Sequence, residues 1–187
     1  MKQSTAIKIG AGVAVAALGG LFVYSRASRP PVINRKVPEP AKPVDLARYL
    51  GKWFELARHE NRFEKGLDAV TADYALAADG RIFIVNTGCQ GGPKGERSVV
   101  EGRAIVADEA TNAKLKVSFF GPLYTGDYWV LDHGDDYGWA IVGEPSGRYL
   151  WLLSRDARPA PERVEALLQR VEALGYDRWA LRITQQG

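Results

Sequence analysis

Gly51-Lys52-Trp53-Phe54-Glu55-Leu56-Ala57-Arg58 is the stretch that decides the fold. Its glycine lets the backbone turn without a Cβ in the way, and the tryptophan two residues later opens a run with strand character. A second run, Tyr149-Leu150-Trp151-Leu152-Leu153-Ser154-Arg155, lies about a hundred residues downstream and also has strand character. The segments that we expect to form the remaining long strands lie between these two runs.

Turn residues divide the chain between the two runs into short segments of similar length. Asp79-Gly80 is a strong hairpin signal, and Pro145-Ser146-Gly147 marks a later turn. The expected strands lie near residues 53–59, 69–77, 81–89, 97–107, 113–120, 127–132, 138–143 and 148–155. Eight antiparallel strands in up-and-down order close into a barrel whose interior can hold one small ligand. The sequence therefore predicts an all-β fold, an eight-stranded up-and-down antiparallel β-barrel.

A helical repeat follows the last long strand. Pro161 suits the first turn of a helix and Gly175 suits its C-terminal stop, and the apolar residues between them fall at helical spacing: Val164, Leu167, Leu168, Val171 and Leu174. This C-terminal α-helix needs an apolar surface to cover. If Arg155 turns inward beneath the barrel, Trp151 and Leu153 point inward as well, and Leu150 and Leu152 point outward. We therefore expect the helix to pack outside the barrel, and residues 178–182 to form a short closing strand.

The chain before the barrel divides into two parts. Residues 1–25 contain an uncharged run of sixteen residues, Ile9 to Tyr24, which predicts a hydrophobic helix acting as a membrane anchor or a signal segment. Residues 26–44 hold five of the ten prolines and predict an extended, basic spacer that builds no core of its own. Asp45 is a candidate N-cap for a turn over 46–49, so the folded domain is expected over residues 45–187. Whether residues 1–25 are cleaved, and which way they cross a membrane, stays open.

Charge and the reactive side chains exclude several functions. Residues 1–44 carry seven Lys or Arg against Glu39, so the formal net charge of +3 leaves the rest of the chain at about −3. The basic character belongs to the N-terminal part, and no nucleic-acid surface is expected. Cys89 is the only cysteine, which excludes an intramolecular disulfide and a cysteine-based zinc site. His59 and His133 do not make a metal set either, and we expect no metal and no cofactor.

Four segments in the expected domain resemble the bacterial outer-membrane lipocalins, with the apolipoprotein D-like branch more distant. The similarity covers roughly residues 45–186, and its segments are 49–58, Arg62-Phe63-Glu64-Lys65-Gly66-Leu67, Leu115-Lys116-Val117-Ser118-Phe119-Phe120-Gly121-Pro122 and 149–155. The resemblance implies that Trp53 and Arg155 form the structural pair that closes one end of the barrel. It also implies binding, storage or transport of fatty acids or lysophospholipids for membrane maintenance, without catalysis, and in some relatives a homodimer.

The N-terminus departs from the family pattern. Relatives of this type are usually lipoproteins attached through an N-terminal cysteine, and no cysteine lies near residues 15–45. The resemblance therefore implies a location in the bacterial cell envelope, with a membrane-anchored chain and a periplasmic domain. The outer membrane follows from the resemblance, and anchoring in the inner membrane stays open because the lipidated cysteine is missing.

The residues expected to line a ligand cavity are apolar or aromatic side chains of the strands, namely Tyr74, Phe83, Val85, Val117, Phe119, Trp129 and Trp151, with Tyr124 at the rim. Each can equally be a plain core residue, because a barrel of this size can be filled by its own side chains. A thiol-dependent enzyme that uses Cys89 is the alternative function, although a nucleophile needs a base or a lowered pKa and neither histidine is near it in sequence.

Apolar residues are concentrated between the fifth and sixth expected strands. Phe119-Phe120-Gly121-Pro122-Leu123-Tyr124 would lie at the open end of the barrel. The simpler interpretation is that these side chains pack on the rim. Our hypothesis is that Leu123 and Tyr124 form a lip that touches a membrane surface beside the entrance.

Overall fold

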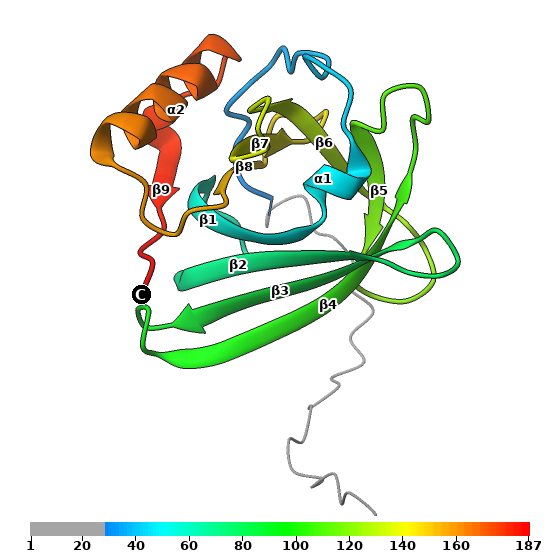
Figure 1. Cartoon of the computed structure of the whole chain (residues 1–187). Coiled ribbons are helices and arrows are strands. Elements are labelled where there is room, and N and C mark those ends of the chain that lie inside the picture. The colour runs from blue at the N-terminus through cyan, green and yellow to red at the C-terminus, as the bar shows by residue number, and fades with distance from the viewer. Residues whose placement is uncertain (1–28) are drawn as a thin grey trace, which may run out of the picture.

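A computed structural model describes residues 29–187, and its core is a closed antiparallel barrel (Figure 1). The strands are β1 (Gly51–His59), β2 (Leu67–Leu76), β3 (Ile82–Gln90), β4 (Glu96–Val106), β5 (Lys114–Ser118), β6 (Gly126–His133), β7 (Trp139–Gly143), β8 (Leu150–Ser154) and β9 (Leu181–Ile183). Each strand from β1 to β8 pairs with the next, and β8 pairs with β1. The expected eight-stranded up-and-down barrel is confirmed.

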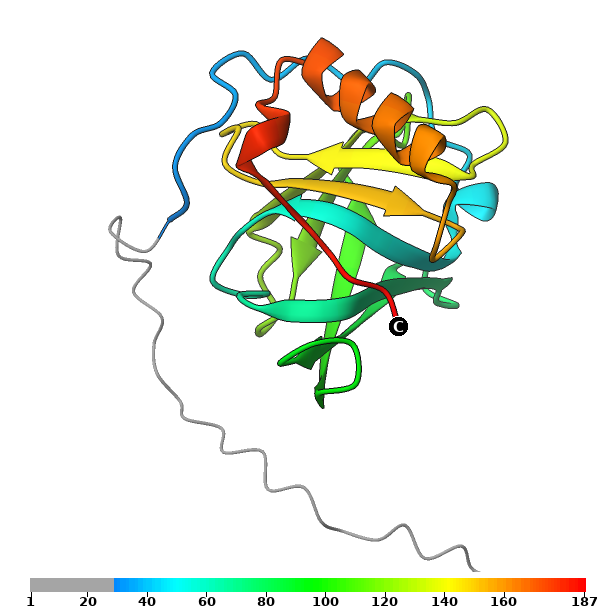
Figure 2. The same cartoon turned by 90° about the vertical axis from the view of Figure 1, so that its left-hand side faces the viewer.

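The barrel wall has a gap between β1 and β2, which the C-terminus fills. β1 pairs with β2 over Gly51–Phe54 alone, and its second half pairs with β9. Beyond β9, the Ala69 N–H donates to the Gln185 carbonyl at 2.7 Å, and the Thr184 N–H donates to the Leu56 carbonyl at 3.0 Å. Figure 2 shows this segment crossing the outside of the barrel towards the C-terminus. The last residues therefore complete the wall.

The C-terminal helix lies outside the barrel as expected. Helix α2 (Pro161–Ala173) buries Leu167, Leu168 and Val171 in a cluster that also contains Leu150 and Leu152. Leu153 and Trp151 belong to the cluster inside the barrel, so the predicted alternation of this strand is confirmed. The expected closing strand over 178–182 differs in part. Residues Arg178–Ala180 form the 3₁₀ turn η2, because the Asp177 carboxylate accepts from the Trp179 N–H, and the strand runs over 181–183.

One end of the barrel is closed by the short helix α1 (Leu46–Tyr49) and by Trp53. Asp45 caps α1, since its carboxylate accepts from the N–H groups of Ala47 and Arg48. The Trp53 side chain is fully buried, and its Nε1–H donates to the Tyr49 carbonyl at 2.8 Å. The Arg155 guanidinium lies 3.8 Å from the centre of the Trp53 indole and donates to the carbonyls of residues 48, 49, 50 and 52. We call this the closed end.

The opposite end, which we call the mouth, is formed by four loops. Because the strands alternate in direction, the loops after β1, β3, β5 and β7 all lie there, at residues 60–66, 91–95, 119–125 and 144–149. The turns after β2, β4 and β6 lie at the closed end with α1.

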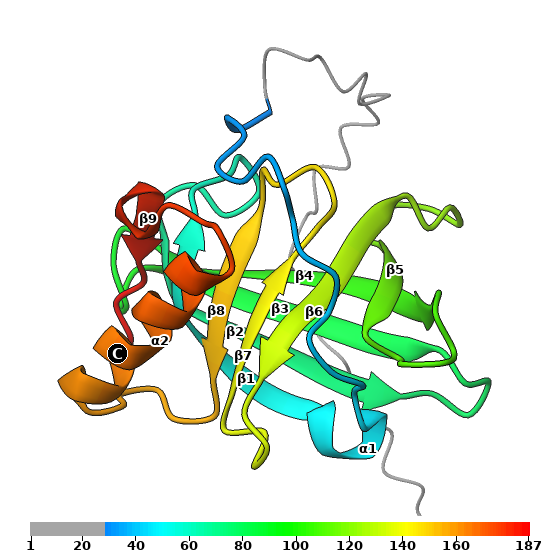
Figure 3. The ribbon, with the colours of Figure 1, turned by 90° about the horizontal axis from the view of Figure 1, so that it is seen from above.

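Residues 30–44, which we call the strap, lie along the outside of the barrel. Figure 3 shows this segment in blue, passing over β6 from one end of the barrel to the other. The Val44 N–H donates to the Thr111 carbonyl at the closed end, and the Ala41 N–H donates to the Leu131 carbonyl at 2.8 Å. The expected spacer is therefore extended but packed against the barrel, because its backbone groups find partners there.

The predicted hydrophobic segment lies outside the described residues. Within residues 29–187, no helix has the length and apolar character needed to cross a membrane.

Candidate functional site

Four of the expected lining residues lie together on the inner face of the barrel. Tyr74 and Val117 belong to the buried inner cluster, and Phe119 and Trp151 pack against it. The pairing explains the match, because Tyr74 lies opposite Ile84 and both belong to that cluster.

Three of the expected lining residues lie on the outer face instead. Phe83 and Val85 alternate with the inward Ile82 and Ile84, and Phe83 is 39% exposed. Trp129 packs against the outer cluster, with the Lys114 ammonium 4.2 Å from its ring centre. The expectation failed for these three because both faces of their strands carry apolar residues, so alternation could not tell the inside from the outside.

Three tyrosine hydroxyls form a chain across the inside of the barrel. The Tyr128 hydroxyl lies 2.7 Å from that of Tyr49 and 2.9 Å from that of Tyr74. Burial raises the pKa of all three phenols, so they are neutral hydrogen-bonding groups. This layer lies next to Trp53, since the Tyr49 and Trp53 rings are 5.1 Å apart. The three tyrosines therefore form the floor of the barrel interior on the mouth side. The sequence pattern did not identify Tyr49 or Tyr128 as members of this layer.

The inner face of β4 is open near the mouth. Gly102 faces inward, because a Cβ there would lie 2.6 Å from the Phe119 ring. Val100 and Ser98 have the same parity as Gly102 and therefore also face inward, yet both are exposed, Val100 by 39%. Across the strand pair from Val100, the side-chain oxygen of Asn86 is buried without a hydrogen-bond partner among the described residues. The inner face of β4 is therefore accessible near the mouth, where Val100 and Ser98 lie beside the unsatisfied side-chain oxygen of Asn86 on β3.

The loop after β1 folds over one side of the mouth. The Glu64 carboxylate accepts from the Trp151 Nε1–H and from the Asn61 side-chain amide, both at 2.8 Å. Asn61 in turn accepts from the N–H groups of Phe63 and Glu64. These bonds fix the loop to the inner face of β8, so entry is confined to the part of the mouth away from β1 and β8.

A buried ion pair lies below this loop. The Arg58 guanidinium donates to the Glu55 carboxylate at 2.7 Å, and neither side chain is more than 2% exposed. Arg58 also donates to the carbonyls of Glu64 and Leu67, which bridges the gap between β1 and β2. Burial raises the pKa of Glu55 to about 7, with the nearby Glu64 charge adding to the effect. This cluster holds the wall together and is coupled to the loop above it.

A pocket of about 380 Å³ opens at the rim between the loops after β1 and β3. It is lined by Arg62, Phe63, Lys65, Leu67, Gln90, Glu96, Arg97 and Ser98. Three of these side chains are cationic and one is anionic, so the rim favours a negatively charged group. Ser98 joins this pocket to the open inner face of β4.

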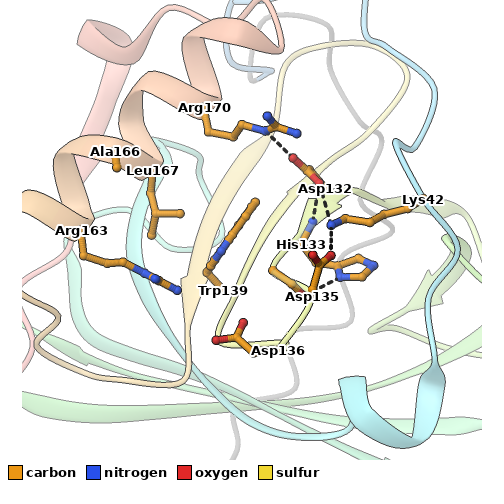
Figure 4. A pocket seen from close by; sticks show the side chains of 11 residues that line it. Lys42, Asp132, His133, Asp135, Asp136, Trp139, Arg163, Ala166, Leu167 and Arg170 are labelled. Atoms are coloured by element: carbon orange, nitrogen blue, oxygen red, sulfur yellow. Dashed lines mark hydrogen bonds and ion pairs between the residues drawn. The ribbon is translucent and has the colours of Figure 1, made fainter.

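A larger depression, of about 550 Å³, lies on the outside of the barrel beneath α2 (Figure 4). Four of its charged side chains form two ion pairs. The buried Asp132 carboxylate accepts from the Arg170 Nε–H at 2.5 Å, and the Lys42 ammonium lies 2.6 Å from Asp135. Because these pairs join the strap, β6 and α2, the depression is a junction that holds the outer elements on the barrel, and it is separate from the inner space.

Neither histidine lies beside Cys89, whose cross-strand partners are Asp68 and Arg97. Both histidines are engaged elsewhere, with His59 Nδ1 2.5 Å from the Arg148 carbonyl and His133 bonded to the carbonyls of Gly134 and Pro43. Both are also buried, so they are locally bonded side chains. The thiol-dependent alternative therefore has no histidine base among residues 29–187.

The loop after β5 carries exposed apolar side chains, but Tyr124 is not one of them. Phe120 is 75% exposed and Leu123 is 71% exposed, whereas Tyr124 is half-buried with its hydroxyl oxygen fully buried. The structure thus places Leu123 where the lip hypothesis needs it. The second exposed apolar side chain of this loop is Phe120, so the lip hypothesis is better stated with Phe120 and Leu123.

The comparisons agree with this geometry. A family model for the lipocalin-like domain matches residues 44–186. The chain belongs to the lipocalin family. Outer membrane lipoprotein Blc of Vibrio cholerae is 42% identical to this lipocalin over 156 residues, which cover 80% of this chain and 89% of that protein. Apolipoprotein D of Oryctolagus cuniculus is 30% identical over 184 residues, covering 94% of this chain and 90% of that protein.

Solved structures show the same fold. Insecticyanin from the tobacco hornworm Manduca sexta superposes on this lipocalin with a TM-score of 0.65 at 21% identity, covering 84% of this chain and 90% of that one. Membership in the family implies that the lipocalin binds a hydrophobic ligand.

Proposed function

We propose that this lipocalin binds and carries a single-chain lipid with an anionic head group, a fatty acid or a lysophospholipid, in the envelope of a bacterium. The open inner face of β4 is the observation that carries the proposal. Val100 faces the inside of the barrel yet is 39% exposed, so an inward apolar side chain is left uncovered near the mouth. An acyl chain is the kind of group that gains from covering it.

Acyl-chain burial supplies the affinity and the rim supplies the orientation. Each buried CH₂ group contributes about 0.8 kcal/mol, so a long acyl chain gains roughly 10 kcal/mol before ordering costs reduce it. The tyrosine layer limits how deep the chain reaches. The rim carries three cationic side chains, Arg62, Lys65 and Arg97. They complement the carboxylate of a fatty acid or the phosphate of a lysophospholipid. The head group would therefore stay at the mouth.

The envelope location is supported by the relatives and by the N-terminal sequence. The Vibrio cholerae relative is named as an outer membrane lipoprotein. Here the residues before the strap include the apolar run Ile9 to Tyr24 in place of a lipidated cysteine. We propose that this run anchors the chain in a membrane and that the barrel stands in the periplasm.

Two neighbouring valines provide a matched test of the binding site. Val100→Trp places a large side chain in the inner space, whereas Val99→Trp places the same side chain on the outer face, where Val99 is 45% exposed. We expect Val100→Trp to weaken binding of a fluorescent fatty acid at least tenfold, and Val99→Trp to leave it unchanged. Thermal melts of both variants show whether the fold is retained. Equal affinity of the two folded variants for the fatty acid would contradict the proposed site.

A further inference from the structure

We propose that the strap, residues 30–44, turns the mouth of the barrel towards the membrane in which the N-terminal run is anchored. The strap begins beside the mouth and ends at the closed end, so the chain before it leaves the molecule at the mouth. This inference rests on the proposed anchoring of the chain, and the experiment below separates the failure of one from the failure of the other.

The start of the strap is bonded to the loop after β7, which belongs to the mouth. The N–H groups of Ile33 and Asn34 donate to the Gly147 carbonyl at 2.9 and 3.1 Å. The Arg148 guanidinium donates to the Pro30 carbonyl at 2.6 Å. A Cβ on Gly147 would lie 1.8 Å from the Asn34 carbonyl oxygen, so this close approach requires a glycine.

A second set of contacts fixes the strap to α2 and to the barrel wall. The buried Asn34 side chain donates to the Leu174 carbonyl at 3.0 Å. The Glu39 carboxylate lies 2.5 Å from the Lys114 ammonium, and the Pro43 carbonyl lies 3.1 Å from His133 Nε2 at the closed end. With both ends and the middle bonded, the strap is part of the folded body and its starting point is fixed.

The chain between the strap and the apolar run is short. Five Cα-to-Cα steps separate Tyr24 from Arg29. Even fully extended, they span at most about 18 Å. If the strap were free, the tether would leave from Asp45 at the closed end, and about fifteen more residues would allow any orientation. The docked strap removes that freedom and keeps the mouth within a short distance of the bilayer surface.

The surface on the mouth side is suited to a bilayer. Trp179 is 84% exposed, and it lies just before β9, whose Leu181 pairs with the last residue of β1, His59. In Figures 2 and 3 the η2 turn and the start of the strap lie at the same end of the molecule, opposite α1. Phe63, which is 51% exposed, belongs to the mouth as well. Aromatic side chains of this kind settle at the interface between water and lipid.

The distribution of charged residues also distinguishes the mouth side from the closed end. The closed-end turns at 107–113 and 134–138 carry four carboxylates, of which Asp135 is paired with Lys42, and the third turn, 77–81, carries Asp79 and Arg81. The mouth side has the cationic rim pocket and Arg35 and Lys36 near the start of the strap. An anionic membrane surface therefore favours the mouth side over the closed end. A mouth held at the surface would let a lipid pass between bilayer and barrel without crossing water.

The test places a single environment-sensitive label at either end of the full chain in vesicles of phosphatidylethanolamine and phosphatidylglycerol. In a Cys89→Ser background, Trp179→Cys provides the mouth label and Glu109→Cys, in the turn after β4, provides the closed-end label. Each is coupled to an NBD fluorophore, and the vesicles carry a lipid with a shallow quencher. Flotation with the vesicles measures anchoring, and titration with a fluorescent fatty acid measures ligand binding in the same preparations.

The strap hypothesis predicts strong quenching at position 179 and little at position 109. A flexible Gly/Ser insertion of about 40 residues between Ser28 and Arg29, with a root-mean-square length of roughly 35 Å, should cause a several-fold loss of quenching at 179. The same insertion after Gly187 is the matched control and should change nothing.

Three results would overturn the inference. They are equal quenching at both positions in a protein that floats, quenching at 179 that survives the insertion before Arg29, and failure to float. The last result would remove the proposed anchoring while leaving the ligand titration as an independent measure of lipid binding.

Discussion

Replacing Trp53 by alanine should destabilise the barrel while sparing the ligand site. Trp53 is fully buried at the closed end, on the far side of the tyrosine layer from the open part of β4. Its indole stacks under the Arg155 guanidinium and donates to the Tyr49 carbonyl. The variant removes all of these contacts and leaves a cavity beneath α1.

The expected loss can be worked out from these contacts. Truncation of a buried tryptophan costs about 3–5 kcal/mol. The guanidinium stacked on the indole adds about 0.5–2 kcal/mol. We therefore expect the free energy of unfolding to fall by roughly 4–6 kcal/mol, a large part of the 5–15 kcal/mol typical of a domain.

Urea denaturation followed by circular dichroism measures the loss, and titration of the folded fraction with a fluorescent fatty acid measures the affinity. Trp53→Phe is the control, because it keeps most of the apolar packing and should lose less than half as much stability. Unchanged stability of Trp53→Ala, or an affinity that falls more than its stability, would show that Trp53 is not the closing residue we describe.

Two further variants test the buried ion pair and the loop after β5. Burial raises the pKa of Glu55 in the folded protein to about 7, whereas the pKa of a glutamate in an unfolded chain is near 4.3. The free energy of unfolding should therefore fall as pH rises between these values, by roughly 3 kcal/mol relative to Glu55→Gln, and parallel pH profiles of the two proteins would contradict the raised pKa. Replacing Phe120 and Leu123 together by serine should slow extraction of lipid from vesicles and leave affinity for monomeric fatty acid nearly unchanged, because both side chains are exposed outside the cavity. An unaltered extraction rate would exclude the lip.

The fold could be predicted from the sequence because its local signals agree with one another. Asp79-Gly80 marks the β2–β3 turn, the helical repeat after Pro161 matches α2, and the alternation of residues 150–153 assigns both faces of β8. The contact between Trp53 and Arg155 was expected from the family resemblance, since nothing local links residues about a hundred positions apart.

The site could be predicted only where one face of a strand is polar. In β5, Lys114 and Lys116 leave no doubt that Val117 faces inward. In β3 both faces are apolar, so Phe83 could not be distinguished from Ile84, and the choice depends on pairing with β2 and β4. The strap was missed for a different reason. Its contacts are backbone hydrogen bonds to distant carbonyls such as that of Gly147, which leave no periodic signal in the sequence.

Native mass spectrometry of residues 29–187, purified without detergent, tests the central claim most directly. The claim is that the space inside the barrel holds one single-chain lipid. We expect a species heavier than the protein by one fatty acid or lysophospholipid, reduced by Val100→Trp and retained in Val99→Trp. Protein that carries no lipid, and takes up neither a fatty acid nor a lysophospholipid when these are added, would contradict the account.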